Sequence, residues 1–228
     1  MVDNSPKINI IYEERDFLVL NKPAGVLVHH TKHEKENTLV DWLLKRFPQI
    51  KQVGEKGRQG IVHRLDKNVS GLMVVAKTLL MYNSLIEQFR CRRVEKKYMA
   101  LVWGKPPKKE AIIKKPIGRT KTDQLIVVNS EKNIKNKKQA ITKYKVLKEF
   151  RRFTLLKLDL LTGRTHQIRL HLKSINCPIL GDKKKESFDI QRIFLHSFGL
   201  GFHDLSNQWR EFEIDLPNKL KNIIKNIQ

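Results

Sequence analysis

The amino-acid sequence predicts a mixed α+β protein, and two observations support this class. Short runs of β-branched and apolar residues recur along the chain, bounded by turns, as half-buried strands do. Between them lie segments with apolar residues at helical spacing. The chain has 228 residues, of which 40% are hydrophobic, so it can bury a sizeable core in one large domain or two small ones.

The N-terminal part begins with two predicted strands, over residues 8–12 and 17–20, separated by a charged turn. The stretch Asn-Lys-Pro-Ala-Gly-Val-Leu-Val-His follows at residues 21–29, where the proline and glycine mark the exit from one strand and the entry to the next. We expect a helix over Thr38–Phe47, because a threonine suits its N-cap, an aspartate stands three residues later and a proline ends it. A polar, glycine-rich loop over residues 49–60 leads onward.

Residues 61–77 form the stretch around which the rest of the chain is organised. Their sequence, Ile-Val-His-Arg-Leu-Asp-Lys-Asn-Val-Ser-Gly-Leu-Met-Val-Val-Ala-Lys, predicts a strand, a turn at the Ser-Gly pair and a second strand. If the first part is extended, the period of two places Arg64 and Asp66 on one face, so that an acid and a base are presented together. The ordinary alternative is that Asp66 caps the turn and forms a surface ion pair with Arg64.

The middle of the chain is predicted to hold a helix and then several strands. Apolar residues at helical spacing predict the helix over residues 78–92. A strand over residues 96–104 follows, with Tyr98 near its start. Between residues 105 and 138, lysine clusters alternate with short apolar pieces, which indicates hairpins joined by basic loops.

The C-terminal part contains a second block rich in polar residues. Residues 162–172 read Thr-Gly-Arg-Thr-His-Gln-Ile-Arg-Leu-His-Leu, which turns at the glycine and then shows helical spacing. Arg169 follows His166 by three residues, so both can lie on one helical face. Around this block, strands are predicted over residues 140–147, 153–161, 193–198 and 209–216, and a short docking helix from residue 218.

The charge of the chain points to a polyanionic partner. Lysine and arginine total 46 against 23 acidic residues, which gives a formal net charge of +23 and a pI of about 10.1. Nucleic acid is the partner that such a field favours. A compositional bias toward Lys, Asn and Ile, as in residues 221–227, would also add lysines, so arginines within motifs carry more weight.

The two cysteines, Cys91 and Cys177, make neither a disulfide framework nor a zinc pattern. The sequence has no run of about 18 apolar residues, and its N-terminus lacks the basic and apolar regions of a signal peptide. We therefore expect a cytoplasmic protein in a reducing compartment, with no membrane partner.

Several motifs together resemble the RluA-like family of RNA pseudouridine synthases. His-Arg-Leu-Asp at residues 63–66, followed by Ser-Gly-Leu, is similar to the family's signature, and Gly-Arg-Thr-His-Gln-Ile-Arg-x-His-Leu at residues 163–172 is similar to its later motif. Asn-Lys-Pro-x-Gly at residues 21–25 and Lys-x-Tyr-x-Ala-Leu-Val at residues 96–102 match two further motifs. The resemblance runs from about residue 10 to residue 216, with the motifs in the family's order.

The resemblance implies both a fold and a site. The fold is a single catalytic domain over residues 1–228, with a mixed, mostly antiparallel central sheet, flanking helices and basic loops, and without the N-terminal RNA-binding domain of larger relatives. In the family an aspartate is catalytic, an aromatic ring lies against the target base, and an arginine forms a salt bridge with the aspartate and keeps it ionised. Carried over to this chain, the catalytic residues are Asp66, Tyr98 and Arg169, and the RNA-binding residues are His63, Arg64, Arg164, His166, Gln167 and Leu195.

The reaction implied is the isomerisation of uridine to pseudouridine in ribosomal RNA of the large subunit or in transfer RNA. The family uses no metal and no cofactor, and we expect a monomer whose partner is RNA. The target base must be flipped out of its stack, which suits an aromatic platform and a cation such as Arg64. Asp66 would either attack the sugar or abstract a proton, and the sequence leaves these two roles open.

Two other classes of function compete with this one. A non-catalytic RNA-binding or ribosome-assembly protein on the same fold would be expected to lack core residues such as Asp66 or Arg169, and both are present. A metal-dependent nuclease needs clustered carboxylates, which the sequence does not show. His63, His166 and His171 likewise lack the carboxylates or thiols that would complete a set of metal ligands.

Overall fold

The computed structural model describes residues 8–30, 36–128, 134–182, 190 and 192–227. The chain divides into two compact units. The first unit comprises Met1–Val94 and Gly199–Ile214, and the second comprises Glu95–Phe198 and Asp215–Gln228. Each unit is described by itself.

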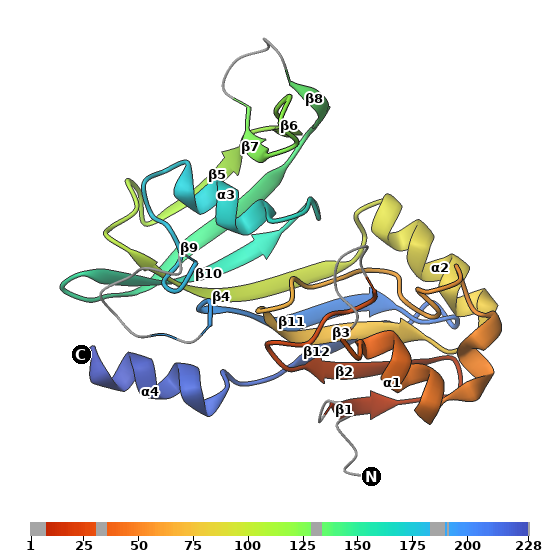
Figure 1. The fold of residues 1–228 in the computed structure, drawn as a ribbon. Coiled ribbons are helices and arrows are strands. Elements are labelled where there is room, and N and C mark those ends of the chain that lie inside the picture. The colour runs from red at the N-terminus through yellow and green to blue at the C-terminus, as the bar shows by residue number, and fades with distance from the viewer. Residues whose placement is uncertain (1–7, 31–35, 129–133, 183–189, 191, 228) are drawn as a thin grey trace. The chain divides into compact units, whose positions relative to one another are not determined.

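The first unit is built on a three-stranded antiparallel arrangement in which β2 lies between β1 and β3 (Figure 1). All seven residues of β3 and five of the six in β2 are buried, and strands covered on both faces read as continuous apolar runs. The elements of this unit are β1 (Asn9–Glu13), β2 (Phe17–Lys22), α1 (Leu39–Arg46), the 3-10 helix η1 (Pro48–Gln52), β3 (Ser70–Ala76), α2 (Leu79–Arg90), the end of β11 (Leu195–His203) and β12 (Trp209–Glu213).

The helix α1 begins where its sequence predicts. The Thr38 hydroxyl accepts a hydrogen bond from the Asp41 N–H at 3.3 Å, and the Asp41 carboxylate accepts one from the Thr38 N–H at 2.7 Å. This reciprocal pair is a capping box, which satisfies amides that the first turn leaves without partners. The helix α2 begins at a second threonine cap, Thr78, and packs against β3.

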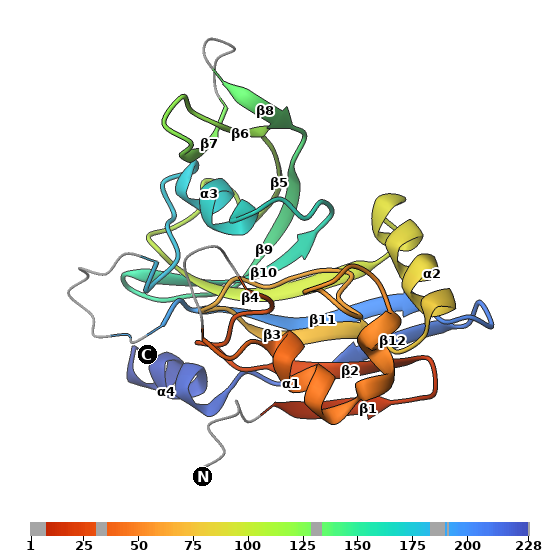
Figure 2. The same cartoon turned by 45° about the vertical axis from the view of Figure 1, so that its right-hand side comes forward.

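The second unit contains a four-stranded antiparallel arrangement in the order β4, β10, β9 and β5, and a separate three-stranded sheet in the order β7, β6 and β8. The helix α3 lies against β9 (Figure 2). The elements are β4 (Glu95–Trp103), β5 (Glu110–Lys114), β6 (Ile117–Arg119), β7 (Leu125–Val127), β8 (Lys135–Lys138), β9 (Ile141–Glu149), β10 (Phe153–Leu160), α3 (Gln167–Lys173), the start of β11 and α4 (Asn218–Asn226).

The sequence patterns account for these elements. In β10, Leu156 and Leu158 are fully buried whereas Lys157 and Asp159 are partly exposed, as the alternation predicts. In α4, Leu220 is the buried member of the apolar stripe. Of the hairpins predicted between residues 105 and 138, β6 and β7 form one, and β8 pairs with β6, whereas β5 pairs with β9 instead. Residues 129–133 lie outside the described part of the chain.

Several predictions of local structure are wrong. The turn predicted at the Ser-Gly pair is absent, because Ser70 and Gly71 are the first residues of β3 and Gly71 lies opposite Lys22 of β2. The strand predicted after the Pro-Gly turn is also absent, since residues 26–30 form no strand.

Residues 62–69 do not form a strand, since Ile61 makes only an isolated bridge with Val75 before β3 begins. His166 is not inside α3 but precedes it in a left-handed conformation with φ 54°, so it does not share a helical face with Arg169. By contrast, the mixed α+β class with mostly antiparallel pairing is confirmed, because every strand pair within either unit whose register is described is antiparallel. The single catalytic domain stays a prediction.

Candidate active site

Asp66 lies in the irregular segment that leads into β3. Its side chain is partly buried, and its main-chain carbonyl accepts a hydrogen bond from the Val69 N–H at 3.0 Å, which closes a turn just before the strand. Because β3 is buried along its whole length, this turn is attached to a rigid element. The carboxylate therefore stands at the mouth of a turn, but this turn spans residues 66–69 and not the predicted Ser-Gly pair, which belongs to β3.

Lys22 holds the loop beside Asp66 in place. Its side chain is fully buried, and its ammonium donates to the carbonyls of Pro23 at 2.8 Å, Val26 at 2.7 Å and Lys67 at 3.1 Å. An ammonium has three protons to donate, and these three carbonyls offset much of its loss of hydration. The Lys67 carbonyl also accepts from the Gly25 N–H at 2.8 Å.

The motif Asn-Lys-Pro-x-Gly is thereby tied to the residue that follows Asp66. The lysine was not predicted from the sequence as a member of the site. One signal was available, since the lysine stands at the end of an apolar strand, directly before a Pro-Gly turn whose carbonyls have no ladder partners.

His63 is attached to the framework of the first unit. Its Nε2 atom accepts a hydrogen bond from the Val74 N–H at 3.1 Å, and its ring stacks on Phe89 with centroids 4.9 Å apart. These contacts join the segment that carries Asp66 to both β3 and α2. The predicted contact of His63 with RNA stays a prediction.

Arg64 has an exposed side chain, and one of its Nη atoms lies 3.1 Å from Nε2 of His29. His29 is only 8% exposed, and burial is the main cause that lowers its pKa below the ordinary value for histidine. The guanidinium is thus anchored at one corner by a buried ring while the rest of it faces solvent.

In the second unit, a buried polar network fixes the segment before α3. Gln167 is 2% exposed, and its amide oxygen accepts from the Thr162 hydroxyl at 2.7 Å and from the Arg164 N–H at 3.0 Å. Its amide nitrogen donates to the Ile141 carbonyl and to the Thr142 hydroxyl, both at 3.0 Å. Gln167 therefore anchors the loop to β9, and its predicted contact with RNA stays a prediction.

His171 extends this network on the next turn of α3. It is fully buried, its Nε2 atom lies 2.9 Å from the Lys115 carbonyl, and its Nδ1 atom lies 2.9 Å from the Thr142 hydroxyl. The carbonyl can only accept, so Nε2 carries the proton and Nδ1 accepts from the hydroxyl. Burial lowers the pKa of His171, which favours this neutral form.

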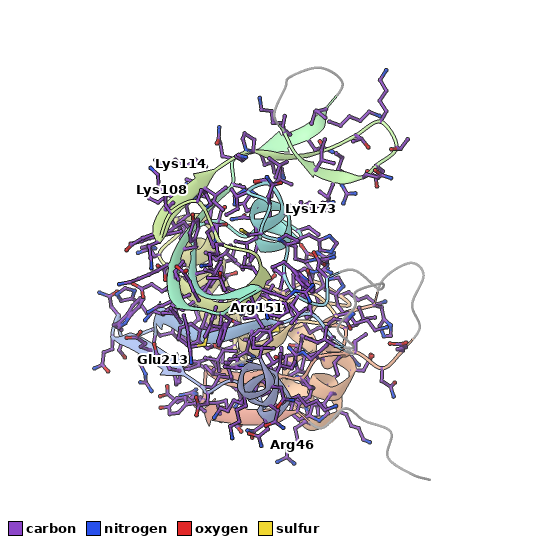
Figure 3. All side chains as sticks on the ribbon, turned by 90° about the vertical axis from the view of Figure 1, so that its left-hand side faces the viewer. Arg46, Lys108, Lys114, Arg151, Lys173 and Glu213 are labelled. Carbon is purple, nitrogen blue, oxygen red and sulfur yellow. The ribbon has the colours of Figure 1, made fainter. Side chains whose placement is uncertain are left out.

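The network leaves His166 exposed and Arg164 partly exposed. Arg164, Arg119 and Lys138 line a polar pocket of about 460 Å³, and none of the described residues that line it is acidic. Arg164 donates to the Gln139 carbonyl at 3.1 Å, and Arg119 pairs with Asp123 at 2.9 Å. Further exposed cations of this unit include Lys108, Lys114, Arg151 and Lys173 (Figure 3). The arrangement suits a phosphate backbone.

The remaining predicted site residues also belong to the second unit. Tyr98 is 5% exposed and lies opposite Leu158 in the pairing of β4 with β10. Leu195 is buried at the start of β11. Arg169 donates through Nε and Nη2 to one carboxylate oxygen of Asp182, each at 2.7 Å. Since Asp66 belongs to the first unit, its predicted pairing with Arg169 stays a prediction.

The structure thus brings together two groups of predicted residues. His63, Arg64 and Asp66 share one segment of the first unit, and Arg164, His166, Gln167 and Arg169 surround the start of α3 in the second. Within the described residues, no three His, Cys, Asp or Glu side chains gather as metal ligands would. No helix in the described part of the chain is long and apolar enough to cross a membrane.

Comparison with known proteins identifies the family. Residues 16–174 match the RNA pseudouridylate synthase family. An uncharacterized RNA pseudouridine synthase of Bacillus subtilis is 38% identical over 225 residues, which cover 97% of this chain and 73% of that protein. The ribosomal large subunit pseudouridine synthase D of Buchnera aphidicola is 44% identical over 238 residues, with coverage of 95% and 71%.

A solved structure agrees with these sequence matches. Human RNA pseudouridylate synthase domain containing 4 superposes with a TM-score of 0.74 and 26% identity, and the match covers 96% of this chain and 92% of that one. The chain belongs to the RNA pseudouridylate synthase family, and it is an isomerase that converts uridine to pseudouridine in RNA.

Proposed function

We propose that the chain isomerises uridines of large-subunit ribosomal RNA, with Asp66 as its catalytic carboxylate. The observation that carries the choice of RNA is the similarity to two proteins named ribosomal large subunit pseudouridine synthase D, at 44% and 42% identity over at least 95% of this chain. The chain acts in the cytoplasm as a monomer, and it requires no cofactor.

The isomerisation keeps all the atoms of the uridine. The bond from C1′ to N1 breaks, the uracil turns while it is held, and a bond from C1′ to C5 forms. The hydrogen on C5 then leaves as a proton, and N1 gains one. Asp66 assists either by attacking C1′, which gives a transient ester, or by accepting a proton from the substrate. Either role requires an ionised carboxylate.

The surroundings of Asp66 support this role. The turn that carries it is held by the buried Lys22 ammonium through the Lys67 carbonyl, which restricts where the carboxylate can point. Arg169 is the proposed cation partner of Asp66. Tyr98 is the proposed platform for the uracil, because an aromatic ring offers a stacking face to any base.

We assign the binding of RNA to positively charged residues in the segment of Asp66 and around the start of α3. Arg64 is proposed to enter the RNA helix beside the flipped nucleotide, and Arg164 to contact the backbone through its cationic pocket. The net charge of +23 supports both contacts.

The test of the substrate is to map pseudouridines in RNA from a strain that lacks the gene. Carbodiimide adducts stop reverse transcription at pseudouridine, so a missing stop in large-subunit RNA that purified enzyme restores would support the proposal. Stops that are missing and restored only in transfer RNA would overturn the choice of substrate while leaving the isomerase intact.

A further inference from the structure

Arg64 is held by an unusual partner for an arginine. Its guanidinium contacts the ring of His29 at 3.1 Å, and it forms no ion pair with a carboxylate among the residues that the structure describes. We infer that His29 is a positioning residue that orients Arg64 toward RNA by accepting a hydrogen bond in its neutral form. This inference rests on the proposed contact between Arg64 and RNA.

The two neighbours of the ring fix its protonation. Nδ1 of His29 lies 2.9 Å from the main-chain carbonyl of His30. A carbonyl can only accept, so Nδ1 carries the proton. A guanidinium can only donate, so Nε2 must offer its lone pair to Arg64. The geometry is therefore consistent only with a neutral imidazole that donates on one side and accepts on the other.

The ring is rigidly placed, whereas the arginine is exposed. The carbonyls of Leu27 and Val28, just before His29, accept hydrogen bonds from the first amides of α1, at 2.8 and 3.0 Å. The side chain of His30 points to Asp41, at 2.9 Å, and takes no part in the contact with Arg64. His29 thus follows two residues that are fixed against the start of α1, and it offers a fixed acceptor to an exposed side chain.

A neutral acceptor has a consequence that a carboxylate would not have. A carboxylate would orient Arg64 equally well but would cancel its charge. The imidazole uses one N–H of the guanidinium and leaves the positive charge and the other donors for a phosphate or a base edge. The pair His29–Arg64 therefore orients a cation and leaves its charge available for an anionic ligand.

The test separates orientation from other effects by two matched variants. In His29→Gln, the side-chain amide oxygen can occupy the place of Nε2 and accept from Arg64. In His29→Asn, the shorter amide replaces Nδ1 and does not reach Arg64. We expect His29→Asn to raise KM and the Kd for RNA roughly 3- to 10-fold, the cost of ordering one long side chain on binding, while kcat changes less than about twofold. His29→Gln should recover most of the loss.

A double-mutant cycle with Arg64→Ala decides whether His29 acts through Arg64. We expect His29→Asn to cause no further loss of RNA affinity when Arg64 is already alanine. His30→Gln is the matched control on the neighbouring residue, and it should leave KM unchanged, since only the main-chain carbonyl of His30 meets His29. Thermal unfolding of each variant checks that the fold is retained.

Three results would overturn the inference. The first is that His29→Asn weakens RNA binding equally in the presence of Arg64 and in the Arg64→Ala background. The second is that His29→Asn lowers kcat at constant KM. The third is that His29→Gln binds RNA as weakly as His29→Asn. A wild-type protein that forms no pseudouridine would instead refute the proposed function, and the cycle measured by RNA binding would still decide the role of His29.

Discussion

Replacing Lys22 by methionine removes the buried ammonium that ties the Pro-Gly loop to the residue after Asp66. Methionine keeps most of the length and the apolar character of the stem, but the carbonyls of Pro23, Val26 and Lys67 lose a charged donor. A hydrogen bond to a charged group contributes roughly 1.5–3 kcal/mol. Three such bonds are not additive, and the variant no longer has to dehydrate an ammonium. We therefore expect a loss of about 3–5 kcal/mol in the free energy of unfolding.

The assay is urea unfolding at pH 7.5, followed by circular dichroism and tryptophan fluorescence. The matched control is Lys221→Met, which removes an exposed ion pair with Asp215 at 2.9 Å and should cost under about 1 kcal/mol. A Lys22→Met variant no less stable than this control would refute the role given to the buried ammonium.

Three further predictions follow from the second unit. Burial lowers the pKa of His171, so the unfolded chain takes up a proton first as the pH falls below about 6.5. The free energy of unfolding of the wild type, measured in urea, should therefore fall between pH 7.5 and 5.5, and that of His171→Gln should fall less. An equal fall in both proteins would contradict this prediction. Gln167→Glu replaces an amide donor by an oxygen facing the Ile141 carbonyl, so unfolding should become easier by roughly 2–3 kcal/mol, and an unchanged urea midpoint would count against the network. Tyr98→Phe keeps the ring, so the Kd for RNA in filter binding should stay within about twofold; a tenfold weakening would contradict a stacking role.

The helices and strands were predictable where the signal is local. The Thr38 cap and the aspartate three residues later define the start of α1 by themselves. The alternation in β10 and the continuous apolar run in β3 likewise follow from burial on one face or on both. In each case the residues that determine the element lie within it.

The sequence failed where the conformation depends on distant partners. Residues 62–69 follow an apolar residue that suggested a strand, but they obtain their contacts from elsewhere, through His63 with Val74 and Phe89. Lys22 meets the Lys67 carbonyl across 45 positions in the chain, and Arg64 meets His29 across 35. No spacing rule reports such contacts, because they arise only after the segments pack.

The resemblance to a family names candidate site residues but not the contacts that each one makes. The motif around α3 was predicted to contact RNA, yet Gln167 is committed to the protein's own hydrogen bonds. The left-handed conformation of His166 was also not foreseeable, since it depends on how the anchored loop enters the helix. Some residues of this motif therefore hold the segment before α3 in place, and others are exposed to solvent on it.

The most direct test of the central claim is the release of tritium from uridine labelled at C5, in large-subunit ribosomal RNA from a strain lacking the gene. Since C5 loses its hydrogen only when the new bond forms there, wild-type protein should release tritium. Asp66→Asn should release none while its Kd for RNA stays within a few-fold, because only the carboxylate changes. Release by Asp66→Asn at the wild-type rate would contradict the catalytic role of Asp66, and no release by the wild type from any RNA fraction would contradict the assignment of the isomerase.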